Sequence, residues 1–174
     1  RLSLVGSEMC IRDRPWTAQW ITTTGANDRH PIFYHTLPDG ADKKVTKARL
    51  YICGLGLYEA YLDGVKIGAD WLTPGFNAYH LWVQTQTYDV TEMMQSRPKE
   101  LSILAGDGWY KSRIPFEGSS VGFYGNDYRV LAELHIEYAD GSKEVLSTDE
   151  SWQVRRSNIT FSGIYDGEWQ DETL

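Results

Sequence analysis

Residues 57–67 read LYEAYLDGVKI, and this stretch decides the fold. The segment 57–62 is expected to form one β-strand and the segment 65–67 a second. Asp63-Gly64 stands between them, and this dipeptide tolerates the positive φ angles of a tight primed turn. The stretch therefore predicts a β-hairpin.

The rest of the chain repeats this pattern of short strands and tight turns. Asp-Gly occurs five times, and helical periodicity is nearly absent. Long connections at 68–78 and 105–127 suggest crossovers between two sheets. This pattern predicts an all-β fold, an antiparallel jelly-roll-like β-sandwich. Further strands are expected at 16–21, 32–37, 47–53, 79–88, 100–104, 128–138, 143–147, 152–155 and 159–164.

Two segments make sharper predictions. The segment 128–138 places five apolar residues on one face (Val130, Ala132, Leu134, Ile136 and Tyr138) and sends Arg129, Glu133, His135 and Glu137 to the other. One short helix is expected near 89–95, with Asp89 as its N-cap, Glu92 closing a capping box and Pro98 stopping it.

Composition excludes some classes of function. The net charge of −7 argues against a nucleic-acid partner, which demands clustered positive charge. No apolar run approaches the roughly 20 residues that span a bilayer, so no membrane partner is expected. The two cysteines imply no disulfide framework. Aromatic residues make up 13% of the chain, which suits a packed sheet core and also sugar-binding surfaces.

The segment 1–14 is unlike the rest of the chain. Residues 4–13, LVGSEMCIRD, can be written as the codons of a transposase-type sequencing adapter read in frame. A signal peptide would need a longer apolar stretch without charges. We therefore expect 1–14 to be a disordered adapter artefact, 15–174 to form one domain, and any signal peptide to have been lost upstream.

The sequence offers no catalytic or transition-metal motif. Asp107, Glu117 and Asp127 lie in a glycine-rich stretch where they could meet, but solvated loop residues are the simpler interpretation. The four histidines lack the spacing of a metal site. The chain alone is therefore expected to be inactive as an enzyme.

Two loop segments favour binding instead. Gly106-Asp107-Gly108-Trp109-Tyr110 and Gly122-Phe123-Tyr124-Gly125-Asn126-Asp127 combine aromatic rings, glycines, an amide and acids. Rings can cover the apolar face of a sugar while amides and carboxylates bind its hydroxyls. The alternative is that Trp109 and Tyr124 merely cover the end of the sandwich. Candidate sugar-binding residues are Trp109, Tyr110, Tyr124 and Asn126. Candidate calcium ligands are Asn77, Asp107 and Asp127, whose oxygens suit a hard cation.

The order of motifs resembles the N-terminal domain of bacterial α-L-rhamnosidases. The hairpin region 54–68 (GLGLYEAYLDGVKIG) is similar to a family motif, although Asp63 replaces an asparagine. The other similar motifs are LTPGF at 72–76, YDVT at 88–91, GDGWY at 106–110, YADG at 138–141 and TDESW at 148–152. Gly167-Glu168 resembles the exit motif, although Gln170 stands where the family more often has tyrosine.

The resemblance implies a β-sandwich placed before a catalytic (α/α)6 barrel that hydrolyses terminal α-L-rhamnose by inversion. That barrel carries the acid and base, so no residue here inherits a catalytic role. In some relatives the equivalent module binds rhamnose with calcium. The expected function is an accessory domain that either recognises rhamnose-containing glycan or supports the catalytic domain of the same chain. The alternative is a free-standing lectin-like module.

Overall fold

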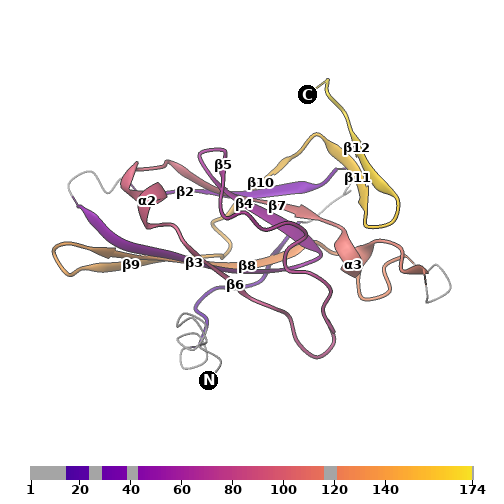
Figure 1. The fold of residues 1–174 in the computed structure, drawn as a ribbon, viewed down its shortest axis with the longest axis horizontal. Helices are drawn as coiled ribbons and strands as arrows, with labels where there is room; N and C mark the ends of the chain where they lie inside the picture. Colours follow the sequence, from indigo (N-terminus) through magenta and orange to yellow (C-terminus); the bar gives the residue numbers. More distant parts are fainter. Residues whose placement is uncertain (1–14, 24–28, 39–42, 116–120, 174) are drawn as a thin grey trace.

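The computed structural model describes residues 15–23, 29–38, 43–115 and 121–173. Strands dominate these residues, and the only helices among them are two short ones (Figure 1). The predicted strands at 79–88 and 16–21 are mostly wrong, because only Gln86–Asp89 and Ile21–Thr22 join a ladder. The elements are β1 (Ile21–Thr22), β2 (Pro31–Thr36), β3 (Val45–Leu55), β4 (Leu57–Leu62), β5 (Val65–Lys66), β6 (Gln86–Asp89), α2 (Thr91–Gln95), β7 (Glu100–Gly106), α3 (Gly108–Lys111), β8 (Arg129–Tyr138), β9 (Lys143–Ser147), β10 (Gln153–Arg156), β11 (Ile159–Gly163) and β12 (Gly167–Gln170).

Two antiparallel five-stranded sheets form the layers of the molecule. One has the order β1-β8-β3-β6, with β9 also paired to β8, and the other has the order β10-β2-β7-β4-β5. The strands β11 and β12 form a separate hairpin. Both long connections cross between the layers, from β5 to β6 and from β7 to β8, as predicted. The all-β sandwich is therefore confirmed, while the jelly-roll connectivity stays a prediction.

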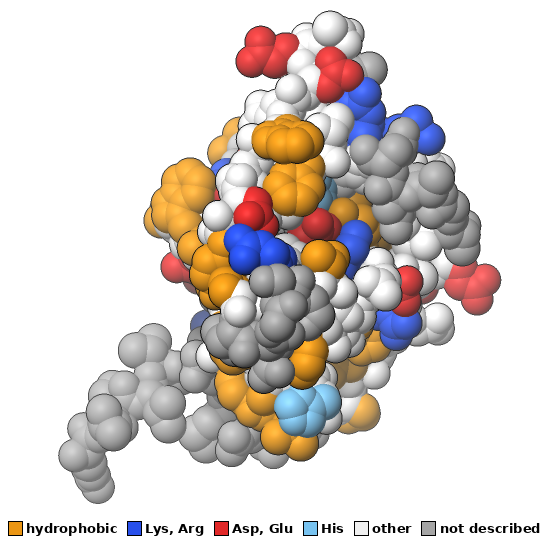
Figure 2. Space-filling model, turned by 90° about the vertical axis from the view of Figure 1, so that its right-hand side faces the viewer, with side chains coloured by type: hydrophobic (Ala, Val, Ile, Leu, Met, Phe, Trp, Pro, Cys, Tyr) orange, Lys and Arg blue, Asp and Glu red, His pale blue; other side chains and the backbone are white. Residues whose placement is uncertain are grey.

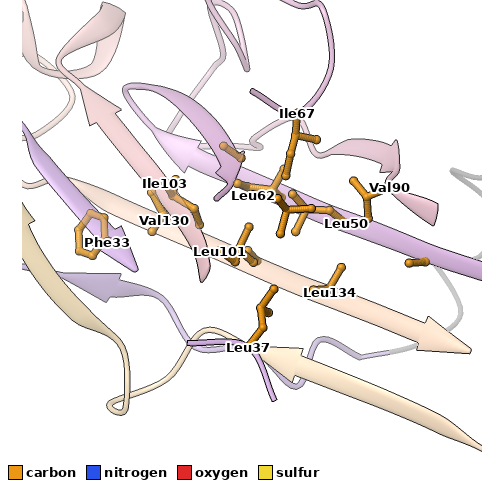
Figure 3. Packing of buried hydrophobic residues seen from close by; sticks show 14 of the residues in the cluster. Phe33, Leu37, Leu50, Leu62, Ile67, Val90, Leu101, Ile103, Val130 and Leu134 are labelled. Atoms are coloured by element: carbon orange, nitrogen blue, oxygen red, sulfur yellow. The ribbon is translucent and has the colours of Figure 1, made fainter. Parts of the chain in front are cut away.

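The core lies between the two sheets. Strands of both layers contribute fully buried side chains, and Figure 3 shows how they meet. Each such aliphatic or aromatic side chain contributes about 1.5–3 kcal/mol on burial. The predicted apolar face of β8 is confirmed, because all five of its residues belong to the buried cluster (Val130, Ala132, Leu134, Ile136 and Tyr138).

The predicted hairpin joins β4 to β5. Asp63 and Gly64 have φ angles of 46° and 78°, as a primed turn requires. The carboxylate of Asp63 also accepts hydrogen bonds from the backbone N–H groups of Lys99 and Glu100, both at 2.9 Å. An aspartate at this position therefore fastens the turn to the beginning of β7.

The predicted helix near 89–95 is confirmed as α2, but its beginning differs. Val90 is the N-cap residue and makes no side-chain cap. Asp89 instead accepts hydrogen bonds from the backbone N–H and the hydroxyl of Thr91, at 3.0 and 2.6 Å. Thr91 also accepts a bond from Ala48 of β3 at 2.9 Å, which holds the helix against the sheet.

Glu133 of β8 was expected to face solvent and is buried instead. The segment before β1 lies across it: Thr17 and Ala18 donate backbone hydrogen bonds to one carboxylate oxygen at 2.5 and 3.0 Å. His135 lies 2.8 Å from the other oxygen. Burial alone would raise the pKa of Glu133, but these hydrogen bonds outweigh it and hold the pKa below its usual value. The segment 15–20 is thus a strap over the sheet and not a strand.

No helix among the residues described is both long enough and apolar enough to cross a bilayer. The predicted artefact at 1–14 and Glu117 lie outside the described residues.

Candidate functional site

The two crossover connections meet at one end of the sandwich, beside the hairpin β11–β12 (Figure 1). The first connection runs from β5 to β6 and carries Phe76, Asn77 and Tyr79. The second runs from β7 to β8 through α3 and carries Trp109 and the residues up to Asp127. All seven residues that the sequence predicted for binding therefore lie on these two connections.

Five rings join the connections, and we call them the aromatic cluster: Phe76, Tyr79, Trp109, Tyr110 and Tyr124. Phe76 lies 6.2 Å from Trp109 and 6.3 Å from Tyr124, measured between ring centroids. Tyr79 lies 5.2 Å from Tyr110 and 5.0 Å from Tyr124. The structure thus brings together the three predicted sugar-binding rings. It adds Phe76 and Tyr79, which the sequence analysis missed because they stand outside the two glycine-rich segments.

The rings pack mostly edge to face. The interplanar angle is 76° between Phe76 and Trp109 and 68° between Tyr79 and Tyr110. Such pairs stabilise one another by about 0.5–1.5 kcal/mol beyond burial. Rings engaged in this way cover the end of the sandwich and do not form a flat platform.

Glycines allow the second connection to approach the cluster. A Cβ atom at Gly125 would lie 2.1 Å from the Tyr110 hydroxyl, so only glycine fits there. Gly122 has a φ of 69°, and its missing side chain leaves room for Asn126. Asn126 itself is exposed.

Asn77, predicted as a calcium ligand, is completely buried and holds its own loop together. Its amide donates to the Gly75 carbonyl at 3.0 Å, and its side-chain oxygen accepts from the Gln84 N–H at 3.0 Å. This pairing satisfies backbone groups in a long loop that has no ladder to satisfy them.

Asp107 belongs to a polar network beneath the aromatic cluster. Its carboxylate accepts a hydrogen bond from Tyr128 at 2.6 Å and lies 3.2 Å from the Lys111 ammonium. The same ammonium lies 3.5 Å from the centre of the Tyr128 ring. Burial, followed by the charge of Asp107, raises the pKa of Tyr128. The network fixes the end of β7 and the beginning of β8 to α3.

His30 also belongs to this network. It is 2% exposed, and its Nδ1 atom lies 3.0 Å from the Tyr128 hydroxyl. Burial lowers the pKa of His30, and the charge of Asp107 opposes this only in part. The imidazole is therefore kept neutral inside the fold.

The third predicted calcium ligand, Asp127, is exposed and paired with Arg129 at 2.9 Å. Two of the three predicted calcium ligands, Asp107 and Asp127, thus have a cationic side chain beside them. The side-chain oxygen of Asn77 already accepts a hydrogen bond from the Gln84 N–H. Calcium takes six to eight oxygen ligands, so these residues do not fit it as they lie. Across the described part of the chain, no three His, Cys, Asp or Glu side chains gather as metal ligands. The calcium site stays a prediction that this geometry does not favour.

Large apolar side chains stand exposed on the same two connections, and we call them the apolar end: Phe76, Leu81, Trp82, Val121 and Phe123. Their exposed fractions run from 48% for Phe76 and Phe123 to 74% for Leu81. Phe123 packs on Tyr124 at 4.8 Å, which links it to the cluster. Figure 2 shows hydrophobic side chains gathered on this end of the molecule, with a histidine among them. Exposed apolar side chains gathered in this way are a candidate interaction site.

Comparisons with known proteins identify the family. The sequence model of the α-L-rhamnosidase N-terminal domain matches residues 43–174. An α-L-rhamnosidase of Streptomyces avermitilis is 39% identical over 129 residues, which are 74% of this chain and 12% of that protein. An α-L-rhamnosidase of Alteromonas sp. is 34% identical over 176 residues, covering 94% of this chain and 19% of that protein.

A solved structure agrees. The crystal structure of native α-L-rhamnosidase from Aspergillus terreus superimposes with a TM-score of 0.77 at 33% identity, covering 87% of this chain and 18% of that one. The chain thus spans less than a fifth of the length of each of these relatives. The match includes both crossover connections and the hairpin β11–β12. The chain belongs to the α-L-rhamnosidase family, and the part of that family it represents is the N-terminal domain.

Proposed function

We propose that this domain is an accessory, non-catalytic module of an α-L-rhamnosidase, and that its apolar end packs against the remainder of the enzyme. The whole protein would hydrolyse terminal α-L-rhamnose, with acid and base residues on its catalytic (α/α)6 domain. The observation that carries the proposal is the apolar end, because five large side chains are exposed on loops that buried polar contacts hold in place.

The apolar end suits a protein surface better than a free sugar. A sugar-binding site needs open ring faces beside polar groups that are free to bind hydroxyls. Here the rings of the aromatic cluster pack edge to face, and the carboxylate of Asp107 already binds Tyr128 and Lys111. Covering one large apolar side chain contributes about 1.5–3 kcal/mol. The relative from Alteromonas sp. is more than five times as long as this chain, so in the proposed whole enzyme most of the protein lies outside this domain and is available to cover the apolar end.

A chimera tests the proposal. The matching segment of the Streptomyces avermitilis enzyme is replaced by residues 15–174 of this chain, and hydrolysis of an aryl α-L-rhamnoside is followed with the melting temperature. The triple variant Phe76→Ser, Trp82→Ser and Phe123→Ser should lower the melting temperature of the chimera and its activity. The same changes should lower the melting temperature of the isolated chain by less, because there they remove only the contacts of Phe76 and Phe123 with neighbouring rings.

The matched control is the double variant Val145→Ser and Val154→Ser. These residues are 46% and 45% exposed, close to the 48% of Phe76, but they lie on β9 and β10. The control should leave the chimera unchanged. Equal effects of both variants, or no effect of either, would overturn the docking proposal.

The second role that the sequence left open, recognition of rhamnose-containing glycan at the aromatic cluster, has its own test. The isolated chain is titrated with L-rhamnose, with and without calcium. One ring contact and a few solvated hydrogen bonds supply only about 4 kcal/mol, so we expect binding no tighter than about millimolar. Micromolar binding that needs calcium and is lost in Asp107→Ala would favour recognition over support.

A further inference from the structure

A second surface, the outer face of the sheet β10-β2-β7-β4-β5, carries an ordered row of side chains. The strand registers place Tyr34 opposite Ser102, and Ser102 opposite Tyr61. Gln153 lies opposite Tyr34 at one edge, and Lys66 lies opposite Tyr61 at the other. The row Gln153–Tyr34–Ser102–Tyr61–Lys66 therefore crosses every strand of this sheet.

This row points away from the core. Successive residues of a strand face opposite sides, and the neighbours Phe33, Ile103 and Ala60 are all in the buried cluster. Tyr34 and Tyr61 are half-buried on the outer face. Ser102 lies between them and is buried, with an exposed fraction of 4%.

Two residues of the row, Tyr34 and Tyr61, carry aromatic rings, and one strand lies between them. Tyr34 and Tyr61 stand two strands apart, which is about 10 Å across a sheet. Beyond Lys66 comes Trp71, whose ring lies 3.7 Å from the Lys66 ammonium and which is 77% exposed. Rings spaced in this way match a ligand that presents a similar apolar face at regular intervals.

The polar groups beside the rings are held in place. Tyr34 donates a 2.6 Å hydrogen bond to the Gln153 side chain, and Tyr61 donates to Glu59. The guanidinium of Arg155 lies 4.7 Å from the centre of the Tyr34 ring. The row thus joins ring surfaces with amide, carboxylate and guanidinium groups. Gln153 and Arg155 are exposed, and each has N–H groups beyond these contacts that can bind hydroxyls.

The charges on this face cancel in pairs. Arg155 makes two hydrogen bonds to Glu100, at 2.8 and 2.7 Å, and Lys66 lies 2.5 Å from Glu59. Cancelled charge gives no attraction for an ionic ligand. A neutral ligand rich in hydroxyl groups suits the combination.

We propose that the row Gln153–Tyr34–Ser102–Tyr61–Lys66, extended by Trp71, binds an extended, uncharged polysaccharide chain laid across the strands. Alternate sugars of such a chain present the same face, and these faces stack on Tyr61 and on the sides of the Tyr34 and Trp71 rings away from Arg155 and Lys66. The hydroxyls bind Gln153, Glu59 and Arg155. This site is separate from the apolar end and needs no docking to the remainder of an enzyme, so either proposal can fail alone.

Affinity electrophoresis of the 174-residue chain tests the proposal, with xyloglucan, β-glucan or galactomannan in native gels and polygalacturonate as the charged comparison. We expect at least one uncharged polymer to retard the chain. Tyr34→Ala and Tyr61→Ala should each weaken binding about three- to tenfold, the effect of one lost ring contact. Tyr34→Phe and Tyr61→Phe keep the rings and should keep most of the affinity. Melting curves of all variants establish that they are folded.

The control variants are Phe76→Ala and Trp82→Ala, which change the apolar end and should leave retardation unchanged. Retardation by none of the three uncharged polymers would overturn the proposal. So would retardation that survives in the double variant Tyr34→Ala, Tyr61→Ala, or that is lost in the control variants instead. Binding to polygalacturonate alone would also contradict it, because it would show that charge is recognised.

Discussion

The phenol of Tyr128 donates a 2.6 Å hydrogen bond to the carboxylate of Asp107, which joins the beginning of β8 to the residue before α3. The same hydroxyl lies 3.0 Å from His30, so one phenol connects three segments that are distant in sequence. The GDGWY motif therefore has a structural role at this site, because its acid anchors the loop that carries Trp109 and Tyr110.

Removing this hydroxyl should destabilise the domain. Tyr128→Phe leaves the ring in place. It removes the hydrogen bond that Tyr128 donates to Asp107 and the contact of its hydroxyl with His30. We expect a loss of about 1–3 kcal/mol in the free energy of unfolding, measured with urea, because buried polar groups lose their partner. Tyr34→Phe is the matched control, since its hydroxyl is bonded on the exposed sheet face, and it should cost less than about 0.5 kcal/mol. Equal losses would contradict the role of Tyr128.

His30 should make the stability depend on pH. Its pKa in the folded state is lowered, mainly by burial, so the native protein keeps it neutral while the unfolded chain takes up a proton below about pH 6.5. The free energy of unfolding should therefore fall as the pH drops from 7.5 to 5, by at most about 1.4 kcal/mol per pH unit. The charged groups that act on His30 are Asp107, Lys111 and Glu168.

The variant His30→Gln isolates this effect. It removes the titrating group, and stability between pH 7.5 and 5 should become nearly constant. Carboxylates whose pKa values are lowered in the fold, such as Glu133 and Asp171, lose their contribution only at more acidic pH. An unchanged slope in His30→Gln would show that another group titrates.

Asn77 should be needed for the shape of the first connection. Asn77→Ala leaves the Gln84 N–H without its acceptor and the Gly75 carbonyl without its donor. We expect a loss of about 1–3 kcal/mol in stability, and faster amide exchange of residues 75–84. Asn126→Ala, at an exposed position, is the control and should change neither quantity. A neutral effect of Asn77→Ala would leave the amide without a structural role.

Two truncations test whether the strap over Glu133 stabilises the domain. Deleting residues 1–14, the predicted artefact, should leave the melting temperature unchanged. Deleting residues 1–20 removes the donors Thr17 and Ala18 and exposes a carboxylate that is buried in the fold. The second deletion should cost about 1–3 kcal/mol more than the first. Equal melting temperatures for the two shortened chains would be incompatible with a stabilising strap.

Local patterns predicted much of the fold. The hairpin at Asp63-Gly64 and the apolar face of β8 depend on backbone geometry and on the two-residue period of a strand, and both are visible in sequence. The burial of Glu133 could not be predicted, because Thr17 and Ala18, which donate backbone hydrogen bonds to it, lie more than a hundred positions away in the strap. Likewise, the β-forming residues at 79–85 lie in a loop, where the Gln84 N–H donates to the Asn77 side chain and not to a neighbouring strand.

The candidate site was predicted only in part. The sequence found Trp109, Tyr110 and Tyr124 by their glycine-rich surroundings, and these rings do meet. It could not show that Asp107 is occupied by Lys111, or that Asp127 is paired with Arg129, because such pairs depend on local geometry in the loops. The ring row on the outer sheet face was missed because it depends on the register of five strands.

Hydroxyl-radical footprinting tests the central claim most directly. The isolated chain is compared with the chimera that carries it in place of the matching segment of the Streptomyces avermitilis enzyme, and oxidation is read at each aromatic residue. The docking account predicts that Phe76, Trp82 and Phe123 become protected in the chimera, while Trp71, which packs against Lys66 of β5, stays as reactive as in the isolated chain. Unchanged reactivity of Phe76, Trp82 and Phe123 in an active chimera would contradict the account.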